Sequence, residues 1–339
     1  MRFLLLFTLL IPAVVKSQSI GGRTVYNFLE QANPVLVTGL GGINISTSTS
    51  DPAIAFNTPS LLRQSYDQHI ALSFQSLYGG IKNYQLFTAL YSSKLQTVFS
   101  GGIHYFNYGV VPQTDASGNQ QGEFRPADFI IQGGFARKYL SNWSYGGNLK
   151  FIHSSYGIYK SSGIGLDLSV TYADTSTQLQ ASLLLRNMGF QLSAYQGTEK
   201  DVLPFDIEFG ISKKLQNAPI QFSFTAHHLN QFELLYTDTA FNNSNDYGNG
   251  ESASTADQVF SHIVVSTQVY LGRYVELDAG YNHLRRKELN IGKSGNGLNG
   301  FSMGIGLLFP VIELRYARSY YQNNRSFHQV GLSFSLKGK

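Results

Sequence analysis

Apolar and polar residues alternate along this chain in stretches of about ten residues, and each stretch is followed by a break. In the C-terminal stretch 326–336 the apolar side chains are Val330, Leu332, Phe334 and Leu336, and the residues between them are Gln329, Gly331, Ser333 and Ser335. Because successive side chains of a strand leave opposite faces, a period of two predicts β-strands. Large apolar residues on one face and small polar residues on the other are typical of a transmembrane β-barrel with a polar lumen.

Fourteen stretches have this pattern, so the sequence predicts an all-β fold, a transmembrane antiparallel β-barrel of about 14 strands. Single-chain bacterial barrels have even strand numbers, and a tilted strand crosses the bilayer in about 9–11 residues. The predicted strands are 68–78, 83–93, 96–109, 124–139, 143–156, 162–173, 177–189, 204–214, 219–231, 259–271, 274–287, 300–309, 311–321 and 326–336.

The connections between these strands differ in length according to their position in the chain. After even-numbered strands they are tight turns, such as Ser141-Asn142 and Gly272-Arg273. After odd-numbered strands several are long, namely 110–123, 190–203, 232–258 and 288–299. Outer-membrane barrels have short periplasmic turns and longer extracellular loops. We therefore expect an integral protein of the outer membrane, with the long loops extracellular.

Charged residues within the predicted strands occupy the polar row. Asp206 and Glu208 alternate with apolar residues in one strand, and Glu313 and Arg315 do so in another. A charge facing lipid at mid-membrane costs about 2–4 kcal/mol. These four side chains, together with Gln268, are therefore predicted to face the lumen.

The N-terminal part of the chain lacks the strand pattern. Residues 1–17 contain Arg2, an apolar stretch 3–15 and small residues near Ser17, which predicts a signal peptide cut before Gln18. Residues 18–67 contain turn signals such as Gly39-Leu40-Gly41-Gly42, and we expect this segment to fold back as a plug or hatch. The predicted division is thus 1–17 signal peptide, 18–67 plug segment and 68–339 barrel.

Composition agrees with a membrane barrel and excludes several kinds of site. Only 14% of the 339 residues are charged, against about 25% in soluble domains. No apolar stretch of about 18 residues predicts a transmembrane helix after the signal. There is no cysteine for a disulfide or a thiolate metal site. Without the predicted signal the net charge falls from +4 to +2, which does not favour nucleic-acid binding.

Three strings resemble chemical motifs, but none has the expected context. Residues 295–300 match GxGxxG, yet an alternating strand follows instead of the helix that a dinucleotide needs. Ser302 lies in a GxSxG string, which in hydrolases requires a strand-to-helix turn. His227 and His228 are adjacent, so on a strand they would point to opposite faces and could not share a metal. We predict no catalytic, cofactor-binding or metal-binding residues, no cofactor and no enzymatic activity.

Three strings near the N-terminus resemble the PorQ family of outer-membrane barrels. They are GGRTVYNFL at 21–29, GLGG at 39–42 and DPAIAFNTPSLL at 51–62. The last is also similar to the Asn-Pro-Ala signature in the plug of FadL transporters, to which the PorV barrels are related. One departure is that the chain continues five residues beyond Phe334, whereas such barrels commonly end on an aromatic residue.

The PorQ resemblance implies a non-enzymatic component of the type IX secretion system. Such a barrel would anchor a cell-surface attachment complex that fixes secreted cargo to lipopolysaccharide. Its partners would be a PorZ-like surface protein, a PorU-like sortase, a PorV-like barrel and outer-membrane lipid. The long loops 110–123, 190–203 and 232–258 are the expected docking surface.

Three other functions stay open at this point. A FadL-like transporter of hydrophobic molecules would need an apolar pocket beside the plug, although the predicted lumen rows are polar. A general porin would need a wide open pore. An outer-membrane lipid hydrolase would use Ser302.

Overall fold

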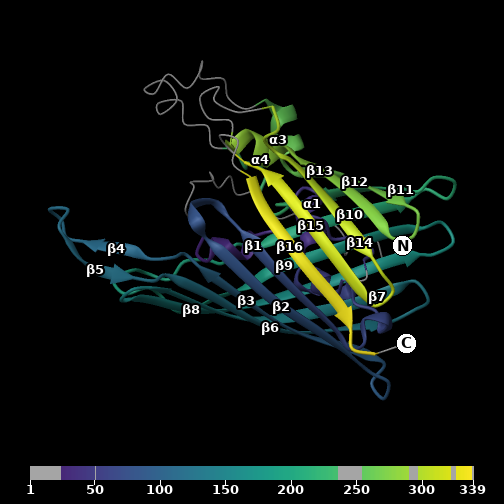
Figure 1. Ribbon diagram of the computed structural model, residues 1–339, viewed down its shortest axis with the longest axis horizontal. Coiled ribbons are helices and arrows are strands. Elements are labelled where there is room, and N and C mark those ends of the chain that lie inside the picture. The colour runs from purple at the N-terminus through teal and green to yellow at the C-terminus, as the bar shows by residue number, and fades with distance from the viewer. Residues whose placement is uncertain (1–23, 50, 236–253, 290–296, 322–325, 338–339) are drawn as a thin grey trace, which may run out of the picture.

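The computed structural model describes residues 24–49, 51–235, 254–289, 297–321 and 326–337. The predicted signal peptide 1–17 lies outside these residues. Fourteen antiparallel strands form a closed barrel, as the alternation predicts (Figure 1). None of the helices within the described ranges has the length and apolar character that a bilayer crossing requires.

The barrel strands follow one another around the ring in chain order. They are β1 (His69–Ser76), β2 (Lys82–Ser92), β3 (Thr97–Asn107), β6 (Ala127–Lys138), β7 (Trp143–Tyr156), β8 (Tyr159–Asp174), β9 (Leu179–Ser193), β10 (Asp206–Lys214), β11 (Ile220–Ala226), β12 (Ile263–Leu271), β13 (Val275–Asn282), β14 (Phe301–Leu308), β15 (Ile312–Tyr320) and β16 (Ser326–Ser335). The first and last strands pair with each other, from His69 opposite Ser335 to Ser76 opposite His328. This pairing removes both edges of the sheet.

The two faces of the strands differ as the alternation predicts. In β10, Phe209 is exposed on the outer surface, whereas Asp206 and Glu208 are buried inside. Glu313 and Arg315 are also buried. The expectation that these four charged side chains avoid the lipid-facing surface is confirmed.

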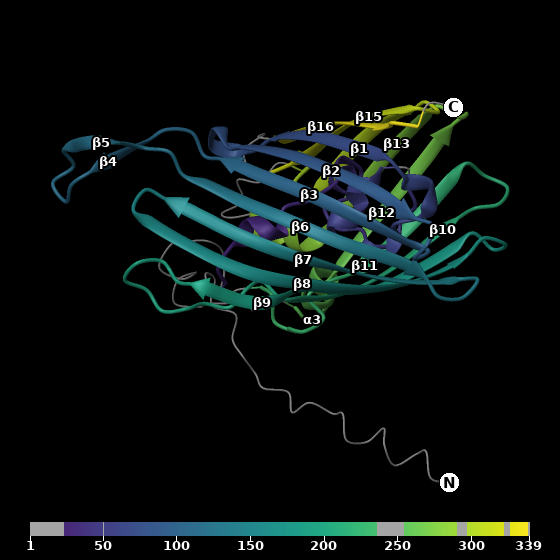
Figure 2. The same ribbon diagram turned by 90° about the horizontal axis from the view of Figure 1, so that it is seen from below.

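The lengths of the connections largely follow the predicted alternation between tight turns and longer loops, with one correction. Connections at one end are tight turns, and several at the other are long, although only residues 157–158 join β7 to β8 there; we call these the short-turn end and the long-loop end. The predicted loop 110–123 contains a hairpin, β4 (Val111–Thr114) and β5 (Gln120–Phe124), which projects beyond the barrel rim in both views (Figures 1 and 2). It is absent from the strand prediction because its side chains are mostly polar on both faces.

Two predicted strands are partly helical at the long-loop end. The predicted strand 259–271 begins within α3 (Thr255–Ser261), which Ser254 caps by accepting the Asp257 N–H at 3.1 Å. The predicted strand 274–287 ends within α4 (His283–Leu289), whose last turn carries Arg286 and Lys287. The two helices lie together, and Lys287 Nζ is 2.9 Å from Asp257 Oδ1.

The remaining helices belong mainly to the N-terminal segment. They are η1 (Asn27–Glu30), α1 (Val35–Gly39), η2 (Pro52–Phe56), η3 (Pro59–Leu61) and η4 (Gln64–Tyr66), and η5 (Tyr78–Gly80) connects β1 to β2. In both views the purple elements of the N-terminal segment lie within the ring of strands (Figures 1 and 2). The domain boundary at residue 67 and the role of a plug stay predictions.

Candidate functional site

The barrel interior contains the N-terminal segment, residues 24–67 of the described chain. In α1 and directly after it, Leu36, Val37 and Leu40 are almost completely buried. A Cβ on Gly280 of β13 would lie 2.1 Å from the carbonyl carbon of Leu40, so only glycine allows this approach. The backbone of the segment therefore lies directly against the inner wall.

One part of the inner wall carries a cluster of apolar side chains between polar ones, and we call this cluster the apolar wall. Its buried inward side chains come from β2, β3, β6 and β7: Phe87, Ala89, Val98, Phe106, Ile130, Ala136 and Ile152. They form one hydrophobic cluster with residues of the segment, including Ile54, Phe56 and Leu61. Burial of this surface helps to hold the segment, and Asn148 of β7 also donates to the Ala55 carbonyl at 2.7 Å.

The opposite part, β10 to β16, is mostly polar, and we call it the polar wall. It binds the segment through side-chain hydrogen bonds. These are Thr38 Oγ1 to Gln329 Oε1 at 2.5 Å, Thr47 Oγ1 to Gln268 Oε1 at 2.5 Å and Ser46 Oγ to Ser212 Oγ at 2.7 Å. Such bonds specify one position along the wall, because a shifted segment would leave buried polar groups unpaired.

The polar wall also contains a compact ionic cluster around Arg315. Its guanidinium lies 3.0 Å from Glu276 Oε1 and 3.7 Å from Asp278 Oδ2, and it also pairs with Glu313. Three carboxylates therefore surround one cation. Burial, with the nearby Glu313 carboxylate, raises the pKa of Asp51 in the segment to about 7.

A second ionic cluster lies where β8 and β9 pair irregularly. The register shifts between Leu166 and Leu168, and Asn187 adopts a φ of 55°. Its N–H donates to Asp167 Oδ1 at 2.8 Å, and Lys150 Nζ lies 2.6 Å from Asp167 Oδ2. These buried contacts hold an irregular strand within an otherwise regular wall.

A cavity of about 950 Å³ opens below the segment at the short-turn end. Its lining combines apolar and aromatic side chains with cationic and polar ones, for example Leu62, Val98, Trp143, Tyr270, Arg63 and Lys214. Part of the apolar wall, including Val98 and Ala136, reaches this cavity.

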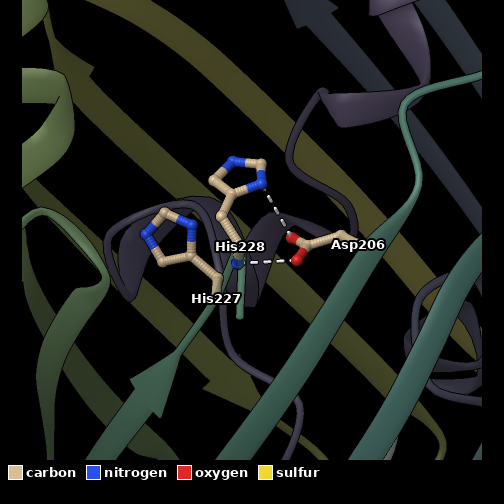
Figure 3. Close-up of side chains that lie close together, drawn as sticks. All are labelled: Asp206, His227 and His228. Carbon is tan, nitrogen blue, oxygen red and sulfur yellow. Dashed lines mark hydrogen bonds and ion pairs between the residues drawn. The ribbon is translucent and has the colours of Figure 1, made fainter. Parts of the chain in front are cut away.

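A third cluster of polar side chains lies at the long-loop end, where the sequence predicts no site. Ligand atoms of Asp206, His227 and His228 lie within 4.8 Å of one another (Figure 3). The prediction that the two histidines point to opposite faces is wrong, because β11 ends at Ala226 and His228 has a φ of 54°. This left-handed conformation brings the two rings to a centroid distance of 4.8 Å.

The other motif strings have ordinary structural roles in the described residues. Ser302 lies in β14 and faces inward, where its hydroxyl contacts Ser319 Oγ at 2.9 Å and accepts from Arg285 Nη1 at 3.2 Å. In the described part of the chain no histidine hydrogen-bonds to it. The string 295–300 lies partly outside the described residues, and β14 follows it, as the alternation predicts.

The three predicted docking loops also differ from one another. Loop 110–123 contains the β4–β5 hairpin, and residues 236–253 of loop 232–258 lie outside the described residues. In loop 190–203, Val202 accepts the Val25 N–H at 3.0 Å. Part of that loop therefore contacts the N-terminal segment.

Comparison with known proteins shows the fold. The chain matches no family model and no curated protein. Among solved structures it is similar to the CymD monoaromatic hydrocarbon channel, with a TM-score of 0.54 and 12% identity over 93% of this chain and 100% of that one. It is also similar to a Pseudomonas aeruginosa FadL homologue, with a TM-score of 0.51 and 9% identity over 91% of this chain and 100% of that one. Both likenesses are to outer-membrane barrels, and neither is to the PorQ family.

Proposed function

We propose that this barrel carries small hydrophobic or amphipathic molecules across the outer membrane. The observation that supports this most directly is the apolar wall beneath the N-terminal segment. The likeness to a monoaromatic hydrocarbon channel and a FadL homologue favours the same class of function. The FadL-like alternative is thus favoured over the attachment role that the PorQ resemblance implies.

The mechanism follows from the two ways in which the segment is held. In the resting state that we propose, the segment covers the apolar wall and blocks the route through the barrel middle. A displaced segment would expose an apolar surface that continues into the 950 Å³ cavity. Such a surface favours an apolar solute over water and ions. The hydrogen bonds to the polar wall would return the segment to one position.

A reversible lock tests this mechanism. The Ser46 and Ser212 hydroxyls are 2.7 Å apart, and the chain has no cysteine, so the pair Ser46→Cys with Ser212→Cys places two thiols within disulfide reach. The measurement is uptake of toluene and of a labelled fatty acid by cells that have this barrel in their outer membrane. Oxidation should abolish barrel-dependent uptake of at least one probe, and reduction should restore it.

The control uses the same position. Ser212 Oγ also lies 2.7 Å from Ser223 Oγ on β11, so Ser212→Cys with Ser223→Cys joins two strands that are already paired. Uptake should be insensitive to oxidation in this variant. Equal uptake by oxidised and reduced Ser46–Ser212 protein would reject the moving segment.

An anchoring function is a second candidate, favoured by the surface at the long-loop end. The β4–β5 hairpin projects from the rim (Figure 2). Exposed apolar side chains near this end are Val110, Ile158, Phe190 and Phe232. Such side chains favour a protein partner, which for a PorQ-like barrel would be a PorZ-like surface protein. Replacing 111–124 by a short turn should then remove that partner from a mild-detergent pull-down. Retention of the partner would argue against this surface.

A further inference from the structure

The long-loop end contains a polar cavity of about 230 Å³ that neither proposed function uses. Asp206, His227 and His228 line it, together with Glu30 from the N-terminal segment. Asp206 begins β10, whereas both histidines follow the end of β11. The cavity therefore lies where two wall strands and the N-terminal segment meet.

The His227 imidazole is the least satisfied polar group of this cavity. The residue is 1% exposed, and neither ring nitrogen has a hydrogen-bond partner among the described residues. Buried polar groups are nearly always paired, and an unpaired one costs about 1–3 kcal/mol. The ring thus offers a free, buried nitrogen beside a carboxylate and a second imidazole (Figure 3).

The backbone holds the two histidines firmly beside Asp206. His227 N donates to the His262 carbonyl at 2.9 Å, and His262 Nδ1 lies 2.9 Å from the His227 carbonyl oxygen. His228 N donates to Asp206 Oδ1 at 2.6 Å. Because these bonds use main-chain atoms, they leave the imidazoles available to a ligand.

We propose that Asp206, His227 and His228 bind a divalent transition-metal ion. Two imidazoles and one carboxylate form a donor set that suits zinc and related metals, with one position open. Ligand atoms around a tetrahedral zinc are about 3.4 Å apart, and His228 Nδ1 lies 3.4 Å from Asp206 Oδ2. The His227 nitrogen lies no more than 4.8 Å from the other two ligand atoms, so it would have to approach them by at most about 1.4 Å to complete the set.

The surrounding charges are compatible with a cation. The nearby Arg186 guanidinium is paired with Glu208 at 3.1 Å. Arg285 also lines the cavity, but so do the carboxyl groups of Glu30 and Glu288. The open metal position would face this cavity. A bound ion would join the start of β10 to the chain that leaves β11.

Metal binding is tested on the full barrel, purified in detergent with an affinity tag that contains no histidine. After treatment with a chelator and dialysis against Zn²⁺, the wild-type protein should retain one zinc per chain. Co²⁺ in its place should give the visible absorption of a tetrahedral site. Loss of an outer-shell partner costs about 10–100-fold in affinity. His227→Gln, His228→Gln and Asp206→Asn should each weaken Zn²⁺ binding by at least about 100-fold.

His328→Gln is the matched control, since this exposed histidine of β16 contacts Tyr316 and Ser326 away from the cavity. Its Zn²⁺ affinity should equal that of the wild type, and heat-modifiable mobility on gels should show that each variant forms a barrel. The proposal is overturned if the wild type retains no zinc or binds it no more tightly than the folded ligand variants. If no ligand variant folds, the wild-type zinc content and the cobalt spectrum decide.

Discussion

Hydrophobic contact predominates where the apolar wall holds the N-terminal segment, and hydrogen bonding predominates where the polar wall holds the same segment. The apolar wall of β2, β3, β6 and β7 forms a hydrophobic cluster with the segment. The polar wall of β10 to β16 forms hydrogen bonds with it and encloses the Arg315 cluster. Outside, both walls present similar apolar side chains to the lipid-facing surface.

The affinity with which the segment is held and the position in which it is held therefore depend mainly on different contacts. Hydrophobic burial is non-directional and tolerates a small shift of the segment. Paired buried polar groups permit one arrangement, because every broken pair leaves a desolvated group. The hydrophobic cluster thus contributes mainly affinity, and the hydrogen bonds of the polar wall contribute mainly position. Variants on the two walls should differ accordingly.

The largest loss of stability is expected from a substitution in the polar wall. Arg315→Ala leaves the buried carboxylates of Glu276, Glu313 and Asp278 without their cation, which should destabilise the barrel by about 3–5 kcal/mol. Urea unfolding in detergent micelles measures this. Arg273→Ala, in the exposed turn after β12, is the control and should have little effect. Equal stability of the two variants would show that the cluster is not needed.

A pH dependence of the segment should follow from Asp51. Its folded pKa of about 7 lies above its ordinary value, so the folded state binds the proton more tightly. Docking should be strongest below about pH 4 and should weaken by up to about 1.4 kcal/mol per pH unit as the pH rises to about 7.

Hydrogen exchange in 35–62 measures this dependence, and Asp51→Asn should largely remove it. Glu199→Gln, on an exposed loop, should leave the dependence unchanged. The same pH profile in wild type and Asp51→Asn would assign the titration to another group.

A smaller loss of stability is expected from a substitution where the backbone of the segment lies closest to the wall. An added methyl group in Gly280→Ala would meet the Leu40 carbonyl carbon at 2.1 Å, so the backbone must shift. Overpacking of this kind costs about 1–3 kcal/mol. Faster hydrogen exchange should be confined to α1 and its neighbours. Gly133→Ala, whose Cβ would meet nothing within 4 Å, is the matched control on β6.

The smallest effect is expected on the apolar wall. Ile152→Val removes one methylene group from a fully buried side chain of β7 and should cost about 0.5–1.5 kcal/mol. Urea unfolding should show this loss without a change in the docked position of the segment. Ile131→Val, on the outer surface of β6, should cost less. A larger loss for Ile131→Val would contradict the assignment of inner and outer faces.

Much of the barrel could be predicted from the sequence, but the candidate sites could not. The inward placement of Asp206, Glu208, Glu313 and Arg315 follows from their row in the alternation. Glu313 and Arg315 pair within β15, but their other ionic partners come from other strands, and neither pattern nor spacing identifies those partners. The relative orientation of the two histidines could not be predicted, because the end of β11 and the positive φ of His228 are not visible in the sequence.

The sequence by itself determined the number of barrel strands, most of their extent and their two faces. The alternation is set locally along each strand, because every second side chain faces lipid and must be apolar. Only the tertiary structure decided how the lumen is filled, because the same inward row can hold Phe87 or Gln268. It also decided that β4 and β5 form a hairpin and that Asp206 meets His227 and His228. The first contact is a local hairpin outside the barrel sheet, and the second depends on how the chain leaves the paired strands β10 and β11.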